Sequence, residues 1–306
     1  MKSGILSSAA RIGFAGLGLL AMGATPARAI VFYSTADPSY NTTAPGGSYA
    51  DSGWQYVGYW GGVVGTPIGP NAFITATHVG GIIGDTFSYN GLSYTTTAVH
   101  NNGDLAVWEV SQPFSSYAPL ISIKPAINAE VVIIGRGTQR GAEVAANGQV
   151  KGWEWGASDG AVRWGVNRVS SNSGSFVRFN FDAGGGANEG FLTGGDSGGP
   201  MFAMEDGIWK LAGVHYGVDG PYSYTSGGAT FNAALSDRGG MYRNGVLFAD
   251  NLADNPGMAY STSIAPNLSW ISSVAAVPVP EPGTIALFAI GGVVLGSASL
   301  RRRRRN

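Results

Sequence analysis

Short apolar runs, separated by turns, fill the chain between about residue 54 and residue 263. The runs are rich in valine, isoleucine, threonine and aromatic residues, and several alternate apolar with polar positions, which is typical of half-buried β-strands. Clusters of glycine, asparagine, aspartate and serine lie between them and predict turns. We expect strands over 54–60, 63–66, 72–76, 85–89, 93–99, 105–110, 130–135, 162–169 and 176–181, and a hairpin of 201–202 with 211–214.

The composition agrees with a single all-β domain. The chain has 306 residues, of which 49 are glycines, and it contains no cysteine. Frequent glycine, tyrosine, tryptophan, valine and threonine favour short strands joined by many turns, and all-β domains reach roughly 200–250 residues. Because no disulfide can form, packing alone must hold the fold together.

The first 29 residues have the pattern of a signal peptide. Basic residues precede the apolar run 12–24, and Ala27-Arg28-Ala29 offers a small-x-small cleavage site. A membrane anchor is the alternative interpretation, but the run is short for one. We therefore expect signal peptidase to be a partner that removes residues 1–29.

The other end of the sequence has the pattern of a sorting signal. Val279-Pro280-Glu281-Pro282-Gly283 precedes the apolar segment 284–300, and five arginines follow it. The segment is just long enough to span a membrane, with the arginines on the cytoplasmic side. The pattern resembles the PEP-CTERM sorting signal of Gram-negative bacteria. It implies a linker over 274–283, a transmembrane segment with an arginine-rich tail over 284–306, and an exosortase-type processing enzyme as a partner.

An ordinary C-terminal anchor is the alternative interpretation of this end. Both interpretations place the body of the protein outside the cytoplasm. The PEP-CTERM interpretation adds that the chain is first anchored in the inner membrane, and reaches the cell surface or the extracellular space after processing.

The charge of the body argues against nucleic acid as a partner. Eight of the 18 basic residues and one of the 19 acidic residues lie in the two terminal segments. The residues between 30 and 280 therefore carry 10 basic and 18 acidic side chains, a net charge of about −8. Domains that bind nucleic acid are instead basic.

A glycine-rich run around one serine carries the candidate chemistry. Four glycines surround Asp196 and Ser197 in 194–200. A nucleophilic serine needs its Oγ exposed on a tight turn, with free backbone N–H groups directed at the oxygen that becomes negative, and glycine permits such a backbone. Upstream, His78 ends one apolar stretch and Asp104 opens another. Taken alone, each of these residues also has a structural explanation, in a turn or after a strand.

Together, the three motifs resemble those of the trypsin/chymotrypsin-like serine proteases, in the same order of histidine, aspartate and serine. The matching segments are Ile74-Thr75-Ala76-Thr77-His78, Asn102-Gly103-Asp104-Leu105-Ala106 and Gly194-Gly195-Asp196-Ser197-Gly198-Gly199-Pro200. The resemblance implies a protease domain over 30–273, with two six-stranded antiparallel Greek-key barrels and a short C-terminal helix. We expect that helix at Asn267-Leu268-Ser269-Trp270-Ile271.

The resemblance also assigns roles. Ser197 is the expected nucleophile, His78 the general base and Asp104 the residue that orients it. The N–H groups of Gly195 and Ser197 are the expected oxyanion hole. The implied substrate is a polypeptide, and neither a cofactor nor a metal is expected.

The specificity pocket follows from the same resemblance. The residue six before the nucleophile forms the base of the S1 pocket in the family, and here it is Phe191, followed by Leu192. This base gives no support for cleavage after basic residues and favours an apolar or small P1 residue. Asn188 and Glu189 are the alternative, if the loop is shifted by one or two residues.

Four further residues are expected beside the substrate. His215-Tyr216-Gly217 stands where the family has Ser-Trp-Gly, an edge that pairs with the substrate backbone. Gly257 belongs to a segment that resembles the family strand beside the pocket. The imidazole of His215 is a candidate to hydrogen-bond Asp104, as the family's serine does. His100 is predicted to be solvated in a polar loop.

Two segments leave alternatives open. Signal cleavage would create an N-terminus at Ile30-Val31, and the resemblance suggests that its ammonium pairs with Asp196, without a zymogen step. The alternative is that Ile30-Val31 simply begins an edge strand. The insertion 218–255, rich in glycine, aspartate, asparagine and tyrosine, either shapes specificity or is a solvated excursion.

Three functions are compatible with these features. The first is an exported serine endopeptidase that works through an acyl-enzyme intermediate, which the intact triad favours. The second is a catalytically silent protease-fold binding module of the cell envelope or exopolysaccharide matrix. The third is an esterase that uses the same triad.

Overall fold

The structure is a computed structural model that describes residues 30–251 and 253–275. The predicted signal peptide, the PEP-CTERM segment and most of the linker lie outside these residues. Within the described part of the chain, no helix is both long enough and apolar enough to cross a membrane.

Twelve strands form two closed six-stranded antiparallel barrels, which confirms the predicted fold class. In each barrel the first three strands are followed around the circle by the sixth, the fifth and the fourth. The first barrel contains β2 Gly58–Trp60, β3 Val63–Gly69, β4 Ala72–Ala76, β5 Thr86–Tyr89, β6 Leu92–Asn102 and β7 Leu105–Val110. The second contains β8 Glu130–Gly135, β11 Arg163–Ser171, β12 Phe176–Asn180, β14 Pro200–Glu205, β15 Ile208–Val218 and β21 Met258–Ser263.

Aromatic packing fills the first barrel. Strand β4 is buried over its whole length, and its Phe73 stacks on Phe87 with ring centroids 3.9 Å apart. Gly58 makes room for that stack, because a Cβ there would lie 2.0 Å from Phe87 Cζ. The central strand that leads to His78 is therefore fixed by packing on both of its faces.

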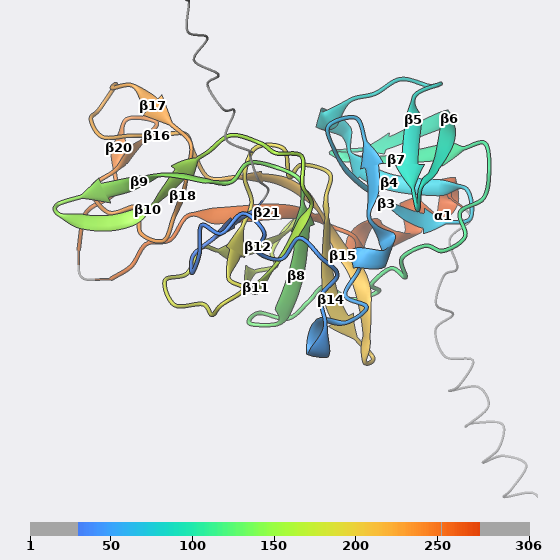
Figure 1. The fold of residues 1–306 in the computed structure, drawn as a ribbon, viewed down its shortest axis with the longest axis horizontal. Coiled ribbons are helices and arrows are strands. Elements are labelled where there is room, and N and C mark those ends of the chain that lie inside the picture. Colours follow the sequence, from blue (N-terminus) through green and yellow to red (C-terminus); the bar gives the residue numbers. More distant parts are fainter. Residues whose placement is uncertain (1–29, 252, 276–306) are drawn as a thin grey trace, which may run out of the picture.

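Aliphatic side chains dominate the second barrel, where residues 131–134 of β8 are fully buried. The helix α1 (Leu268–Val274) follows β21 after one 3-10 turn, Ala265–Asn267, and buries Ile271. It lies beside the first barrel (Figure 1), where Asn102 Nδ2 donates to Asn267 Oδ1 at 3.1 Å. The helix therefore links the two barrels.

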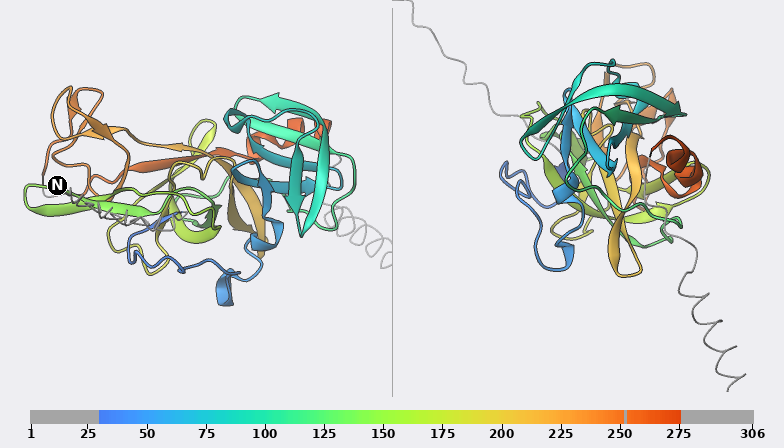
Figure 2. Two further views of the ribbon diagram at one scale, coloured as in Figure 1. Left: turned by 45° about the horizontal axis from the view of Figure 1, so that its top comes forward. Right: turned by 90° about the vertical axis from the view of Figure 1, so that its right-hand side faces the viewer.

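A small lobe extends from the second barrel at the end opposite the first (Figures 1 and 2). It contains a three-stranded sheet in the order β18-β10-β9 and a four-stranded sheet in the order β17-β16-β19-β20. Its strands are β9 Arg140–Ala146, β10 Gln149–Trp155, β16 Tyr222–Ser223, β17 Thr230–Phe231, β18 Ala233–Leu235, β19 Tyr242–Arg243 and β20 Val246–Leu247. Val144, Tyr222, Ala233, Leu235 and Met241 form its core, which is separate from the cores of the barrels.

Two local predictions need correction. Residues 54–56 form a 3-10 turn rather than the start of a strand, because Gly53 adopts a φ of +107° just before it. His100 does not lie in a loop, since β6 continues to Asn102 through its pairing with β7. The remaining short strands are β1 (Val31–Phe32) and β13 (Gly190–Phe191), which pair with each other.

Candidate active site

His78 and Asp104 meet where two neighbouring strands of the first barrel end. His78 lies in the 3-10 turn Thr77–Val79 directly after β4, and Asp104 lies in the turn between β6 and β7. The Nδ1 atom of His78 is 2.8 Å from Asp104 Oδ1 and 2.9 Å from Oδ2, and the backbone N–H of His78 donates to Oδ1 at 3.1 Å. Because a carboxylate only accepts, Nδ1 carries the ring proton and Nε2 is left as the basic nitrogen.

The loop that carries Ser197 packs against the same strand. Gly198 N–H donates to His215 O at 3.0 Å, and His215 N–H donates to Gly199 O at 2.8 Å. On its other side, Gly198 touches β4, because an added Cβ would lie 2.1 Å from Thr75 Oγ1 and 3.3 Å from Ala76 N. The loop that carries Ser197 belongs to the second barrel. It thus packs against β4 of the first barrel at Thr75 and Ala76, two to three positions before His78.

We expect Gly198→Ala to destabilise the domain by roughly 2 kcal/mol or more, because the new methyl group overlaps Thr75 in a packed interior. Gly207→Ala is a matched control, since Gly207 has a φ of +75° against +80° at Gly198 and nothing within 4 Å. Urea unfolding of both variants separates the steric overlap from the cost of the left-handed backbone. Equal losses of stability in the two variants would contradict the close packing of Gly198 against Thr75.

Glycines also shape the turn before the serine. Gly195 adopts a φ of +93°. Within residues 30–251 and 253–275, the backbone N–H groups of Gly195 and Ser197 have no acceptor. They are therefore available to an oxygen atom of a ligand.

Asp196 lies in a closed pocket behind the serine. Its carboxylate accepts from Gly137 N–H at 2.7 Å, from Thr193 N–H at 2.8 Å and from Thr193 Oγ1 at 3.0 Å. Gly135 and Gly137 make the space, because a Cβ at either position would overlap the carboxylate. Burial raises the pKa of Asp196 to about 6, although these hydrogen bonds and one from the backbone of Ile30 act in the opposite direction.

Ile30 is buried beside Asp196, and the following β1 pairs with β13. Its φ of +51° is one that β-branched residues rarely adopt. That torsion exists only because a peptide bond joins Ile30 to residue 29. Cleavage at this bond would remove the torsional constraint and convert the amide nitrogen into an ammonium.

We expect a chain that begins at Ile30 to be more stable at pH 8 than one that retains residues 1–29. With its pKa raised to about 6, Asp196 keeps a proton that the unfolded chain releases near pH 4, so the stability of the uncleaved chain falls between about pH 4 and pH 6 and stays lower above it. An ammonium at Ile30 would lower this pKa and recover on the order of 3 kcal/mol.

Urea unfolding of both chains at pH 4 and pH 8 measures the effect, and N-terminal sequencing identifies the natural end. In Asp196→Asn the pH-dependent part of the difference should vanish. If the two chains have the same stability at both pH values, the pairing of Ile30 with Asp196 is wrong.

Phe191, Leu192 and Gly257, which were predicted to line the pocket, are all buried. Phe191 packs on Phe179 and Phe181. A Cβ on Gly257 would lie 3.8 Å from Phe191 Cζ. Phe191 is therefore adjacent to Gly257 and presents an apolar surface there.

The alternative residues for the base of the pocket are engaged elsewhere. Asn188 Oδ1 accepts from Tyr40 Oη and from Asn41 Nδ2, each at 3.0 Å. Glu189 Oε1 accepts from Asn167 Nδ2 and from the backbone N–H of Asp182, also at 3.0 Å. Burial raises the pKa of Glu189 to about 8, so it is mostly neutral at pH 7. It offers no charge to a basic substrate side chain.

His215 differs from its expected role. Its ring is fully buried, and its Nδ1 lies 3.0 Å from Ser261 Oγ. No hydrogen bond joins the ring to Asp104 in the described residues. Burial lowers the pKa of His215 to about 3, so the ring is neutral. His215 contacts the serine loop through its backbone. The other histidine outside the triad, His100, has its Nε2 atom 2.7 Å from Glu109 Oε1 on the surface of the first barrel.

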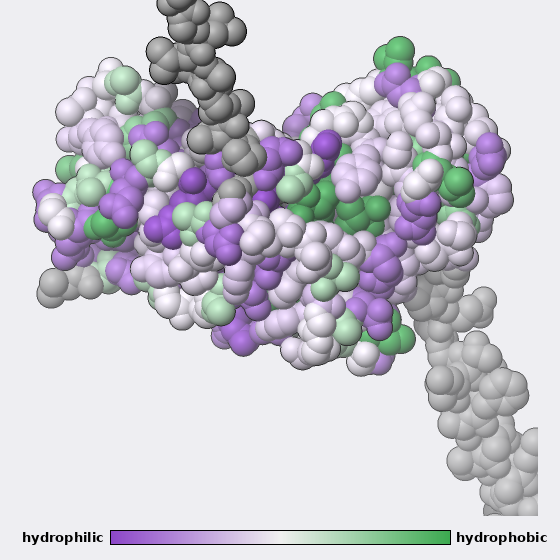
Figure 3. Space-filling view, in the orientation of Figure 1, coloured by the Kyte–Doolittle hydropathy of each residue, from purple (hydrophilic) through white to green (hydrophobic). Residues whose placement is uncertain are grey.

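Tyr216 lies exposed at the edge of the site, with its ring 5.9 Å from that of His78 and 5.0 Å from that of Phe176. Gly217 follows it with no atom near its open face. In a space-filling view, hydrophobic side chains gather where the two barrels meet (Figure 3). This part of the surface suits an extended chain with side chains to bury.

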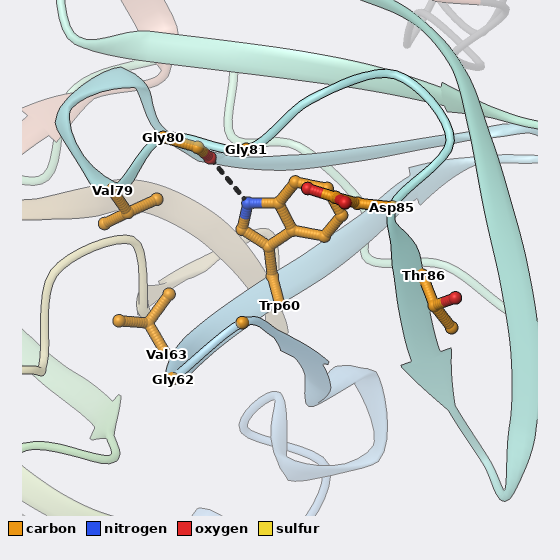
Figure 4. Close-up of a pocket in the computed structure, with 9 residues that line it drawn as sticks. Trp60, Gly62, Val63, Val79, Gly80, Gly81, Asp85 and Thr86 are labelled. Atoms are coloured by element: carbon orange, nitrogen blue, oxygen red, sulfur yellow. Dashed lines mark hydrogen bonds between the residues drawn. The ribbon is translucent and has the colours of Figure 1, made fainter.

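A pocket in the first barrel begins directly after His78, at Val79 and Gly80. Figure 4 shows Trp60 between this turn and the segment of Asp85 and Thr86, with its Nε1 donating to Gly80 O at 2.9 Å. Sequence reasoning missed this pocket, because its wall comes from three separate segments of the barrel.

Sequence reasoning also missed a buried ionic cluster around Asp219, Arg238 and Arg243 at the base of the small lobe. The only signal in the sequence was the presence of arginines in an otherwise glycine- and tyrosine-rich insertion.

Comparisons with known proteins give a match for the C-terminal segment and similar folds for the described residues. A family model of the PEP-CTERM protein-sorting motif matches residues 278–305. No curated protein matches the sequence. Among solved structures, a mutant of human heparin binding protein is similar, with 15% identity and a TM-score of 0.49, over 79% of this chain and 100% of that one. Neuropsin, a serine protease expressed in the limbic system of mouse brain, has 14% identity and a TM-score of 0.44, over 73% of this chain and 96% of that one.

The described residues form two closed six-stranded antiparallel barrels, as the resemblance to trypsin-like serine proteases implied, and the chain carries a PEP-CTERM sorting motif.

Proposed function

We propose that this protein is an exported serine endopeptidase that hydrolyses peptide bonds through Ser197, His78 and Asp104. The observation that carries the proposal is the double contact of His78 Nδ1 with Asp104, at 2.8 and 2.9 Å, beside a serine loop held on the same strand. A histidine fixed in one tautomer next to a serine on a glycine-rich turn is suited to nucleophilic catalysis.

In the first half of the reaction, Ser197 Oγ attacks the carbonyl carbon of the scissile bond, while His78 Nε2 takes the hydroxyl proton. The oxygen that becomes negative accepts hydrogen bonds from Gly195 N–H and Ser197 N–H. The C–N bond then breaks, and His78 gives its proton to the leaving amine. The acyl group remains on Ser197.

In the second half, a water molecule attacks the acyl-enzyme and His78 takes its proton. The ester bond breaks, the proton returns to Ser197 Oγ, and a carboxylic acid leaves. Asp104 stays ionised throughout and stabilises the imidazolium that forms twice in the cycle.

Labelling of the full chain with a fluorophosphonate, followed by peptide mapping, tests this proposal. We expect one modified residue, Ser197. A folded chain that is not labelled favours the binding module, and a label on another serine contradicts the assigned nucleophile. Matched peptide and ester substrates separate an endopeptidase from an esterase.

For its location, we propose export with removal of residues 1–29 by signal peptidase, followed by anchoring through residues 284–306. The PEP-CTERM match at 278–305 supports an exosortase-type enzyme as the processing partner. The protease domain then acts in the envelope, or outside the cell after release.

A further inference from the structure

The insertion 218–255 folds against the expected specificity pocket. It begins where β15 ends, and Asp219 closes that end by donating its N–H to Met258 O at 2.8 Å. Gly257, the pocket residue before Met258, donates its own N–H to Leu235 O of β18 at 2.8 Å. The insertion is therefore part of the pocket wall and not a solvated excursion.

An ionic cluster lies at this wall. The side chain of Asp219 is fully buried and accepts from Arg238 NH1 at 2.9 Å and from Arg243 NH1 at 2.8 Å. Tyr260 Oη donates to the same carboxylate at 2.7 Å. The two guanidinium groups thus share one carboxylate.

The other buried ion pairs of the lobe involve Lys151. Asp237 and Asp250 both pair with the buried Lys151, at 2.5 and 2.9 Å. Neither forms an ion pair with an arginine in the described part of the chain. These two carboxylates carry one charge more than Lys151, so the three acidic and three basic side chains of the two clusters balance overall.

The two arginines differ in how many of their N–H groups already have an acceptor. Arg238 is the more engaged of the two: its guanidinium also donates to Asn255 O and Asn255 Oδ1, and it lies over the ring of Phe248. Arg243 makes only its bond to Asp219, its buried Nε has no partner in the described residues, and its side chain is 30% exposed. Arg243 can therefore donate to a second acceptor.

Tyr222 provides a further donor at the same place. It is 1% exposed, yet its hydroxyl has no hydrogen-bond partner among the described residues. That hydroxyl lies 3.3 Å from where a Cβ on Gly257 would be, on the same side as Phe191. Burial raises the pKa of Tyr222, so the hydroxyl keeps its proton. A ligand oxygen in the pocket would accept a hydrogen bond from this hydroxyl.

We propose that Arg243 and Tyr222 make the specificity pocket select an acidic P1 residue, glutamate or aspartate. The inference rests on the proposed endopeptidase function and extends it to a substrate class. A P1 carboxylate would accept from the Tyr222 hydroxyl and the Arg243 guanidinium, with its methylene groups against Phe191. A basic P1 side chain would instead meet the guanidinium group of Arg243. The proposal replaces the apolar or small P1 residue that Phe191 alone suggested.

Peptide substrates that differ only at P1, with Glu, Asp, Gln, Leu, Phe or Lys, test the proposal on the full chain. Removal of a hydrogen bond to a charged group typically changes binding by roughly 10- to 100-fold. We expect kcat/KM for Glu to exceed that for Gln by such a factor. In Arg243→Gln this ratio should fall to about one, while fluorophosphonate labelling is retained.

Two further variants make the result specific. Arg168→Gln is the matched control, because Arg168 is 63% exposed and paired with Glu130 outside the pocket, and it should leave the Glu-to-Gln ratio unchanged. Tyr222→Phe keeps the packing of the lobe and should lower kcat/KM for the Glu substrate. If Arg243→Gln does not fold, the kcat/KM of Tyr222→Phe for the Glu substrate and the P1 preference of the wild-type protein still test the proposal.

The outcomes separate the two proposals. A chain that is labelled at Ser197 but prefers Leu or Phe at P1 overturns the acidic pocket and leaves the endopeptidase intact. A folded chain that is neither labelled nor active on any peptide overturns both.

Discussion

Replacing Ser197 by alanine should lower kcat/KM on peptides by roughly 10⁴- to 10⁶-fold and abolish fluorophosphonate labelling. The substitution removes only the Oγ atom, which is the proposed nucleophile. The backbone of the turn stays as it is, because its shape depends on Gly195 and Gly198, with φ values of +93° and +80°. Stopped or continuous assays on a peptide pool measure the loss, and circular dichroism shows whether the fold is retained.

The matched control is Ser93→Ala, which removes the same atom from an exposed serine on strand β6. It should leave both labelling and hydrolysis unchanged. Substantial peptide hydrolysis by a verified Ser197→Ala protein would mean that the reaction takes place at another site. The proposed roles of His78 and Asp104 would then have to be abandoned as well.

Asp104→Asn should lower kcat by about 10⁴-fold at neutral pH with little change in KM. Both carboxylate oxygens now lie within 2.9 Å of His78 Nδ1 and keep the ring proton on that nitrogen. An asparagine can donate its amide N–H to Nδ1, which moves the ring proton to Nε2 and leaves no base for Ser197. The KM is expected to stay close to its wild-type value, because Asp104 does not line the substrate pocket.

Steady-state kinetics of Asp104→Asn and of Asp206→Asn give the comparison. Asp206 is 86% exposed and forms a 3.5 Å surface pair with Lys210, so its variant should behave as wild type. A loss below about tenfold in Asp104→Asn would show that the orientation of His78 has little importance for turnover.

The parts of the site that could be predicted from sequence are those that lie next to recognisable strands. His78 and Asp104 directly follow and precede buried strands, so their positions at one end of the first barrel follow from the local pattern. The contact of Gly198 with Thr75 could not be predicted in the same way. It joins residues more than 100 positions apart and depends on how the two barrels dock.

The small lobe was unpredictable for a similar reason. Glycines at 141, 148 and 152 interrupt the apolar alternation of β9 and β10, so the hairpin has no clear strand pattern. Gly152 is needed because a Cβ there would lie 2.0 Å from Ala234 O of the paired strand β18. The hairpin is thus stabilised by a partner about 80 residues later in the chain, which no local window contains.

The separate core of the small lobe bears on how such a protein can evolve. Residues that touch no common partner usually contribute to stability almost independently. Tyr222 and Arg243 belong to the lobe, whereas His78, Asp104 and Ser197 belong to the barrels and their loops. Substitutions in the lobe can therefore retune which side chain the pocket accepts without disturbing the catalytic groups. Related proteins with this fold could therefore differ in substrate preference through changes in the small lobe alone, while the catalytic groups of the barrels stay the same.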